Sequence, residues 1–206
     1  MISISLPFVV PSVRLQVAES NPKIFDPVVL KNMCHEQKII PDVLSCAPNT
    51  VLQVHWKNVS ANLGNELLPD QLSEKPVCQW PHKDEVHYTL VFIAPDMPDP
   101  KNCTQREYQC WVVVNIPGTQ VEKGQVLTAY IPPPTPPADG CQRYVMLLYM
   151  QPRVNITFLY HPYIPPVPNE VVRQKFSATK FSENYAFGTP LAINWFRINW
   201  NSSNRS

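Results

Sequence analysis

Five histidines and six cysteines are the side chains that could act as metal ligands, nucleophiles or disulfide partners. The histidines are scattered, and the cysteines form no Cys-x-x-Cys pair or other zinc-like spacing. The sequence also lacks Gly-x-Ser-x-Gly, His-Glu-x-x-His, Walker and dinucleotide-binding motifs. We therefore expect a protein that is not an enzyme and that uses no metal or cofactor.

The cysteines and the asparagines both favour the secretory pathway. An even number of cysteines is typical of a disulfide-bonded protein, which requires an oxidising compartment. Five Asn-x-Ser/Thr sequons occur, whereas 15 asparagines with 21 serines and threonines would give about 1.5 by chance. Two of the five, at Asn201 and Asn204, lie at the C-terminal end. We predict an extracellular protein, with a cytoplasmic location as the alternative, and N-glycosylation at Asn58, Asn102 and Asn155.

The composition indicates one mainly β domain. The 206 residues are 44% hydrophobic, which is enough to form a core, and the 24 prolines argue against a mostly helical fold. The net charge of +1 gives no basic surface for nucleic acid. No apolar run approaches the roughly 18–20 residues that span a bilayer, so we expect no transmembrane segment.

Residues 1–24 are predicted to be an N-terminal extension or a weak signal peptide. They include an apolar stretch from Ile2 to Val13, but no Lys or Arg precedes it, and Pro7 and Pro11 interrupt it. We expect the folded domain to cover residues 25–200 and a short tail to follow at 201–206.

Proline-free stretches predict the regular elements. Asp26 followed by Pro27 is typical of a helix start, with an apolar face that ends before Pro41, and a second helix is expected over 177–185. Apolar runs rich in β-branched and aromatic residues predict strands, with turn-rich segments between them. The expected strands are 51–56, 87–94, 110–116, 143–150, 155–160 and 191–198. This pattern favours an antiparallel sandwich over βαβ repeats.

Four segments in order closely resemble the phosphatidylethanolamine-binding protein family, also called the Raf-kinase-inhibitor-like family. They are residues 88–100 (YTLVFIAPDMPDP), 106–118 (REYQCWVVVNIPG), a proline loop at 130–138, and 139–151 (DGCQRYVMLLYMQ). These segments resemble the family hallmarks D-P-D-x-P, W-x-H-x-x-V-x-N and G-x-H-R-Y. Further matches at 40–44, 63–72 and 175–190 extend the resemblance over about residues 25–200. It implies a large antiparallel β-core with a smaller sheet and short flanking helices.

The resemblance also implies a small anion pocket, which is altered in this chain. Ala94 replaces the first Asp of the first hallmark, Cys110 and Gln142 replace two histidines, and prolines 132–134 and 136–137 replace a glycine-containing loop. The positions equivalent to the family's pocket are Asp96, Pro98, Tyr108, Cys110, Gln142, Arg143, Tyr144 and Leu191. We expect a weakened anion pocket, or none.

Two pairings near these positions follow from the resemblance. Cys110 aligns with a pocket-lining position and Cys141 lies beside the pocket, so a disulfide between them is expected. Asp96 and Arg143 lie on segments that converge in the family, and a buried charge is tolerated only when it is paired. We therefore expect an ion pair, or hydrogen bonds to loop carbonyls, at these two residues.

These observations predict a non-enzymatic binding or regulatory protein. Its partner would be a phospholipid headgroup, a small hydrophobic ligand or another protein. The alternative is an inhibitor or scaffold that acts through its surface on a protease or a kinase, as some members of the resembled family do.

Overall fold

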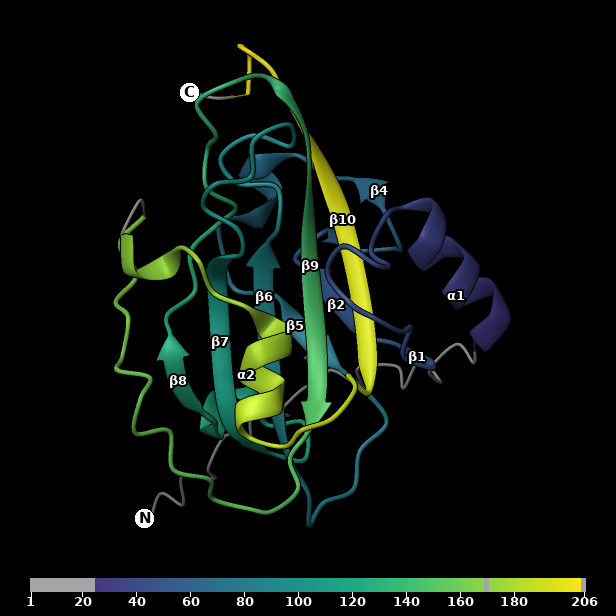
Figure 1. The fold of residues 1–206 in the computed structure, drawn as a ribbon, viewed down its shortest axis with the longest axis vertical. Helices are drawn as coiled ribbons and strands as arrows, with labels where there is room; N and C mark the ends of the chain where they lie inside the picture. Colours follow the sequence, from purple (N-terminus) through teal and green to yellow (C-terminus); the bar gives the residue numbers. More distant parts are fainter. Residues whose placement is uncertain (1–24, 169–170, 205–206) are drawn as a thin grey trace, which may run out of the picture.

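A computed structural model of the chain describes residues 25–168 and 171–204, and the predictions for residues 1–24 lie outside this part. Ten strands and two short α-helices dominate it, with three short 3₁₀ turns (Figure 1). The elements are α1 (Pro27–Glu36), β1 (Thr50–Val51), β2 (Gln53–Trp56), β3 (Val59–Ser60), β4 (Asn65–Glu66), β5 (Val77–Gln79), β6 (His87–Ala94), β7 (Tyr108–Pro117), β8 (Gln125–Thr128), β9 (Gly140–Met150), α2 (Ala178–Asn184) and β10 (Ala192–Trp200).

The strands form a large mixed sheet and a smaller antiparallel sheet. The large sheet has the order β1-β10-β9-β6-β7-β8, and β4 also pairs with β10. Its long strands are antiparallel as predicted, while the two-residue strands β1 and β4 run parallel to β10. The small sheet has the order β3-β2-β5. The fold is therefore the predicted large β-core with a smaller sheet and short helices.

Both predicted helices form where the capping residues place them. The carboxylate of Asp26 accepts a hydrogen bond from the backbone N–H of Val28 at 2.8 Å, which satisfies a donor at the start of α1. Ser177 caps α2 in the same way through the N–H of Lys180 at 3.2 Å. The first helix ends at Glu36, before the predicted limit, and Lys38 then adopts a left-handed conformation with φ 54°.

The strand predicted over 155–160 does not form. Asn155 has φ 53°, and the side-chain amide of Asn115 bonds both backbone groups of Ile156, at 2.9 Å each. A side chain thus occupies the hydrogen-bonding groups that a neighbouring strand would use. The predicted strand over 51–56 is divided instead, because its first part pairs with β10 and its second part with β3 and β5.

Two apolar clusters cover the two faces of the large sheet. On β10, Phe196 and Ile198 belong to the cluster that faces the small sheet, whereas Ile193 and Trp195 belong to the cluster that faces the helices. This alternation follows from the two-residue period of a strand. In Figure 1 α2 crosses one face of the sheet. Of the candidate site, Cys110 and Tyr144 belong to the cluster toward the small sheet, whereas Arg143 of β9 lies on the opposite face and contacts the loop after α1.

Candidate functional site

Arg143 and Asp96 form the predicted buried ion pair. Asp96, on the turn after β6, accepts hydrogen bonds from Nε of Arg143 at 2.9 Å and from Nη2 at 2.5 Å. The backbone N–H of Arg143, near the start of β9, adds a third bond at 2.8 Å. The side chains are 15% and 5% exposed respectively, so water screens the pair weakly. The guanidinium is therefore fixed by protein groups.

A second carboxylate and the loop after α1 complete the coordination of Arg143. Its Nη2 also contacts Asp42 at 2.5 Å, and its Nη1 donates to the carbonyl of Lys38 at 2.5 Å. Arg106 binds Asp42 through two parallel bonds of 2.8 Å. These bonds lower the pKa of Asp42 to about 2, because both guanidinium groups stabilise its ionised form. The sequence analysis did not single out Asp42 or Arg106 as site residues.

A chain of hydrogen bonds joins the other hallmark residues. The indole N–H of Trp200 donates to the hydroxyl of Tyr144 at 3.0 Å, and this hydroxyl donates to Oε1 of Gln142 at 3.2 Å. Nε2 of Gln142 then donates to the carbonyl of Pro98 at 3.0 Å. Tyr144, Gln142 and Trp200 are at most 1% exposed. Trp200 was not among the predicted site residues. It lies four residues after Phe196 on β10, so the two-residue period of the strand places both side chains on the same face of the sheet.

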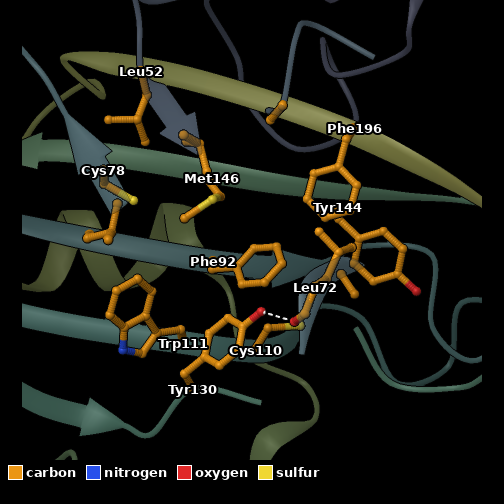
Figure 2. Close-up of a cluster of buried hydrophobic side chains, with 14 of the residues drawn as sticks. Leu52, Leu72, Cys78, Phe92, Cys110, Trp111, Tyr130, Tyr144, Met146 and Phe196 are labelled. Atoms are coloured by element: carbon orange, nitrogen blue, oxygen red, sulfur yellow. Dashed lines mark hydrogen bonds between the residues drawn. The ribbon is translucent and has the colours of Figure 1, made fainter. Parts of the chain in front are cut away.

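Aromatic and aliphatic side chains pack around Tyr144 (Figure 2). The ring of Tyr144 stacks on Phe196 with centroids 5.3 Å apart, and Phe92 packs against both rings. Tyr108 and Cys110 are 1% and 0% exposed and belong to the same cluster. Burial raises the pKa of the Cys110 thiol, so this thiol stays protonated and unreactive at neutral pH.

The proline loop closes one side of the cluster. The backbone N–H of Ile131 donates to the carbonyl of Cys110 at 3.0 Å, which ties the start of the loop to β7. Pro133, Pro134 and Pro136 are buried. Since proline has no N–H, these three residues offer no backbone donor to an anion.

Leu191 lies away from the other predicted site residues. It precedes β10, and its N–H donates to the carbonyl of Leu148 at 2.7 Å. Gln142 lies opposite Ile198 in the register of β9 and β10. Six residues of extended strand therefore separate Gln142 from Leu148, or about 20 Å. The other seven predicted residues lie at the opposite end of β9 or on the segments around it.

The predicted disulfide between Cys110 and Cys141 is not formed. All six cysteines lie among the described residues, and each is a free thiol. Cys110 is buried on β7, while Cys141 is exposed on β9, and β6 lies between these strands. Two strand spacings amount to about 10 Å, more than the ~7 Å that a disulfide can bridge between Cα atoms. This corrects the pairing inferred from the resemblance.

The remaining predictions for the site concern glycans, membranes and metals. Asn58, Asn102 and Asn155 are exposed. No helix in residues 25–168 or 171–204 is both long and apolar enough to cross a membrane. Among the same residues, no group of three or more His, Cys, Asp or Glu side chains is arranged to hold a metal ion.

Known proteins share this sequence pattern and fold. A family model described as "Phosphatidylethanolamine-binding protein" matches residues 33–194. The chain is 31% identical over 168 residues to Protein TERMINAL FLOWER 1 of Arabidopsis thaliana, covering 77% of this chain and 85% of that protein. It is 35% identical over 162 residues to a 26 kDa secreted antigen of Toxocara canis. That match covers 77% of this chain, which spans 60% of the length of the antigen.

A solved structure shares the fold. The crystal structure of carboxypeptidase Y inhibitor, complexed with the cognate proteinase, superposes with a TM-score of 0.72 at 21% identity. The match covers 85% of this chain and 97% of that one. At this identity, the likeness extends to the fold alone.

Proposed function

The chain belongs to the phosphatidylethanolamine-binding protein family, and we propose that it is a non-enzymatic binding or regulatory protein whose anion pocket is closed to phosphate-bearing headgroups. The observation that carries this proposal is the hydrogen-bonded chain from Trp200 through Tyr144 and Gln142 to Pro98. These side chains satisfy one another inside an apolar cluster, so a headgroup would have to displace them.

Charge at the site also argues against an anionic ligand. Arg143 is the cation among the hallmark residues, and it is held by the carboxylates of Asp96 and Asp42. Cys110 and Gln142 supply no positive charge where the family resemblance implies histidines. Each lost hydrogen bond to a charged group costs roughly 1.5–3 kcal/mol, and ~1.4 kcal/mol is a tenfold change in affinity. Two such losses would reduce a micromolar site to about millimolar affinity.

Titration with phosphoethanolamine tests the proposal. We expect no saturation below the millimolar range by calorimetry or by chemical shift at Tyr144. The double variant Cys110→His, Gln142→His restores two imidazoles and is expected to bind more tightly than the wild type. Saturable binding of the wild type at roughly 100 µM or tighter would contradict the closed pocket.

We also propose that the protein is extracellular and glycosylated. The exposure of Asn58, Asn102 and Asn155 supports this, as does the relative named a secreted antigen. Intact mass of protein from secretory expression, before and after glycosidase, tests it. A mass equal to the bare polypeptide in both samples would contradict glycosylation.

A second candidate is an inhibitor or scaffold that acts on a protease or a kinase through its surface. Closure of the pocket favours it, because the outer surface is then left for binding. A purified protease or kinase whose activity falls on addition of the protein, with phosphoethanolamine making no difference, would support this candidate. Competition by phosphoethanolamine would instead support a headgroup ligand.

A further inference from the structure

Large apolar side chains lie exposed along one irregular segment between β9 and α2. Twelve such side chains are exposed among the described residues, and six of them lie between 159 and 172. We call these six the apolar rim: Leu159, Tyr160, Tyr163, Val167, Val171 and Val172. Their exposed fractions range from 44% at Val167 to 89% at Tyr160. Figure 1 shows the segment along the outside of the molecule, beyond β8. A concentration of this kind marks an interaction surface.

The rim is held in a fixed shape by buried polar contacts. Arg173 is 0% exposed, and its guanidinium donates to the carbonyls of Val167 and Ala129, at 3.1 Å each. Ile164 forms a parallel bridge with Thr128 of β8, and its carbonyl accepts from the N–H of Ala129 at 2.9 Å. Because these contacts already hold Ile164 and Val167 in place, binding through this part of the rim would cost little conformational entropy.

Between residues 161 and 168 the backbone presents few free donors. Four of the residues from 161 to 168 are prolines, at positions 162, 165, 166 and 168, and these have no N–H. The N–H groups of His161, Ile164 and Val167 are bonded to backbone carbonyls, at 3.2, 2.8 and 2.8 Å respectively. A backbone N–H or C=O group without a hydrogen bond raises the free energy where water is scarce. Residues 161–168 can therefore enter a poorly hydrated layer at a low free-energy cost.

The charges around the rim are mostly positive. Between residue 152 and the end of α2 at Asn184 the sequence has four Arg or Lys residues and two acidic residues, Glu170 and Glu183. Three of the four cations, Arg153, Lys175 and Lys180, are exposed. Each cation near an anionic lipid surface adds about 1 kcal/mol of attraction at physiological salt.

We propose that the apolar rim docks on the surface of an anionic phospholipid bilayer, with its side chains in the interfacial layer and the flanking cations against the headgroups. Tyr160 and Leu159, at 89% and 79% exposed, project outward, and a fluid bilayer accepts a convex apolar tip without a matching cavity. This docking uses residues away from the candidate site, so it does not depend on whether the pocket binds a headgroup.

Vesicle co-sedimentation tests the proposal, with the protein from secretory expression in its glycosylated form. Wild-type protein is expected to bind vesicles of phosphatidylcholine with phosphatidylserine more tightly than phosphatidylcholine alone, and added salt should reduce this difference. Leu159→Ser with Tyr160→Ser should weaken binding about tenfold or more. Lys175→Glu with Lys180→Glu should remove the preference for phosphatidylserine.

The matched control is Val28→Ser with Val29→Ser, at exposed positions of α1. We expect this variant to bind like the wild type. Equal weakening by the control, or no wild-type binding to either vesicle, would overturn the proposal. Release by excess phosphoethanolamine would assign binding to the headgroup pocket instead. Wild-type self-association that disappears in the Leu159→Ser, Tyr160→Ser variant would assign the rim to a second copy of the chain, which also overturns the proposal.

Discussion

The guanidinium of Arg143 binds both carboxylate oxygens of Asp96, and the backbone N–H of the same arginine binds one of them again. The pair joins the turn after β6 to the start of β9. Because the side chain of Asp96 is only 5% exposed, loss of either partner leaves the other in a poorly hydrated environment. This contact therefore has a structural role that requires no ligand.

Asp96→Asn is expected to destabilise the fold by about 3 kcal/mol, the lower end of the range for a broken buried pair, since Arg143 keeps Asp42. For a chain of this size, this corresponds to a fall of roughly 6–12 °C in Tm, measured by thermal denaturation. Asp84→Asn is the control, because the Asp84 side chain is 94% exposed. Equal Tm values for the two variants would refute a stabilising role for the Asp96 pair.

Tyr144→Phe is expected to lower the free energy of unfolding by about 1–3 kcal/mol. The change removes one hydroxyl and leaves the indole N–H of Trp200 and the Oε1 of Gln142 buried without that partner. Urea denaturation measures the loss. Tyr160→Phe is the control, because it removes a hydroxyl from a residue that is 89% exposed. The unfolding free energy of this variant should match that of the wild type. An unchanged midpoint for Tyr144→Phe would mean that the hydrogen-bonded chain contributes no net stability.

The sequence predicts the long strands well because they are buried on both faces. Strands β6, β7 and β9 are continuous apolar runs, and the predicted ranges overlap each of them closely. The short strands could not be predicted in this way. Asn65 and Glu66 of β4 pair with Phe196 and Arg197, and a two-residue polar strand with such a distant partner has no local signal.

The site was predictable in part, through the family resemblance. It implies that the segments of Asp96 and Arg143 converge, and a buried charge is tolerated only when it is paired. Asp42 follows a proline in a short apolar stretch, and nothing local indicates that it reaches an arginine 101 residues away. Gln142 and Tyr144 lie two residues apart on β9, and their hydroxyl-to-amide bond depends on the packing around Trp200.

The thiols should divide into accessible and buried groups. Cys46 and Cys141 are exposed and Cys103 is half-buried, and burial raises the pKa of Cys141 and Cys103. Cys46 is therefore expected to react fastest with a thiol reagent, and Cys141 and Cys103 more slowly. Burial raises the pKa of the other three thiols, Cys34, Cys78 and Cys110, so they should react only after unfolding. A colorimetric thiol assay in denaturant should then detect all six. Fewer than six would indicate a disulfide in the expressed protein.

Glu107 gives the fold a pH dependence near neutrality. Its Oε2 accepts a hydrogen bond from the N–H of Ala178 at 2.8 Å, but burial dominates and raises its pKa to about 7. In the unfolded chain a glutamate titrates near pH 4.3. Between these values the native state holds a proton that the unfolded chain has released, so stability falls as pH rises. A shift of this size corresponds to roughly 4 kcal/mol across the range.

Glu107→Gln is expected to remove this dependence, since an amide resembles the protonated acid and does not titrate. The variant should match the wild type near pH 5 and exceed it near pH 8 in unfolding free energy, measured by urea denaturation. Burial lowers the pKa of His161, so this residue makes the unfolding free energy rise with pH in the same range. Both proteins contain His161, and its contribution therefore cancels when their unfolding free energies are subtracted. Asp42 titrates at about 2 and Cys34 at about 11, which are outside the range. A constant difference between the two proteins from pH 5 to 8 would show that Glu107 does not titrate there.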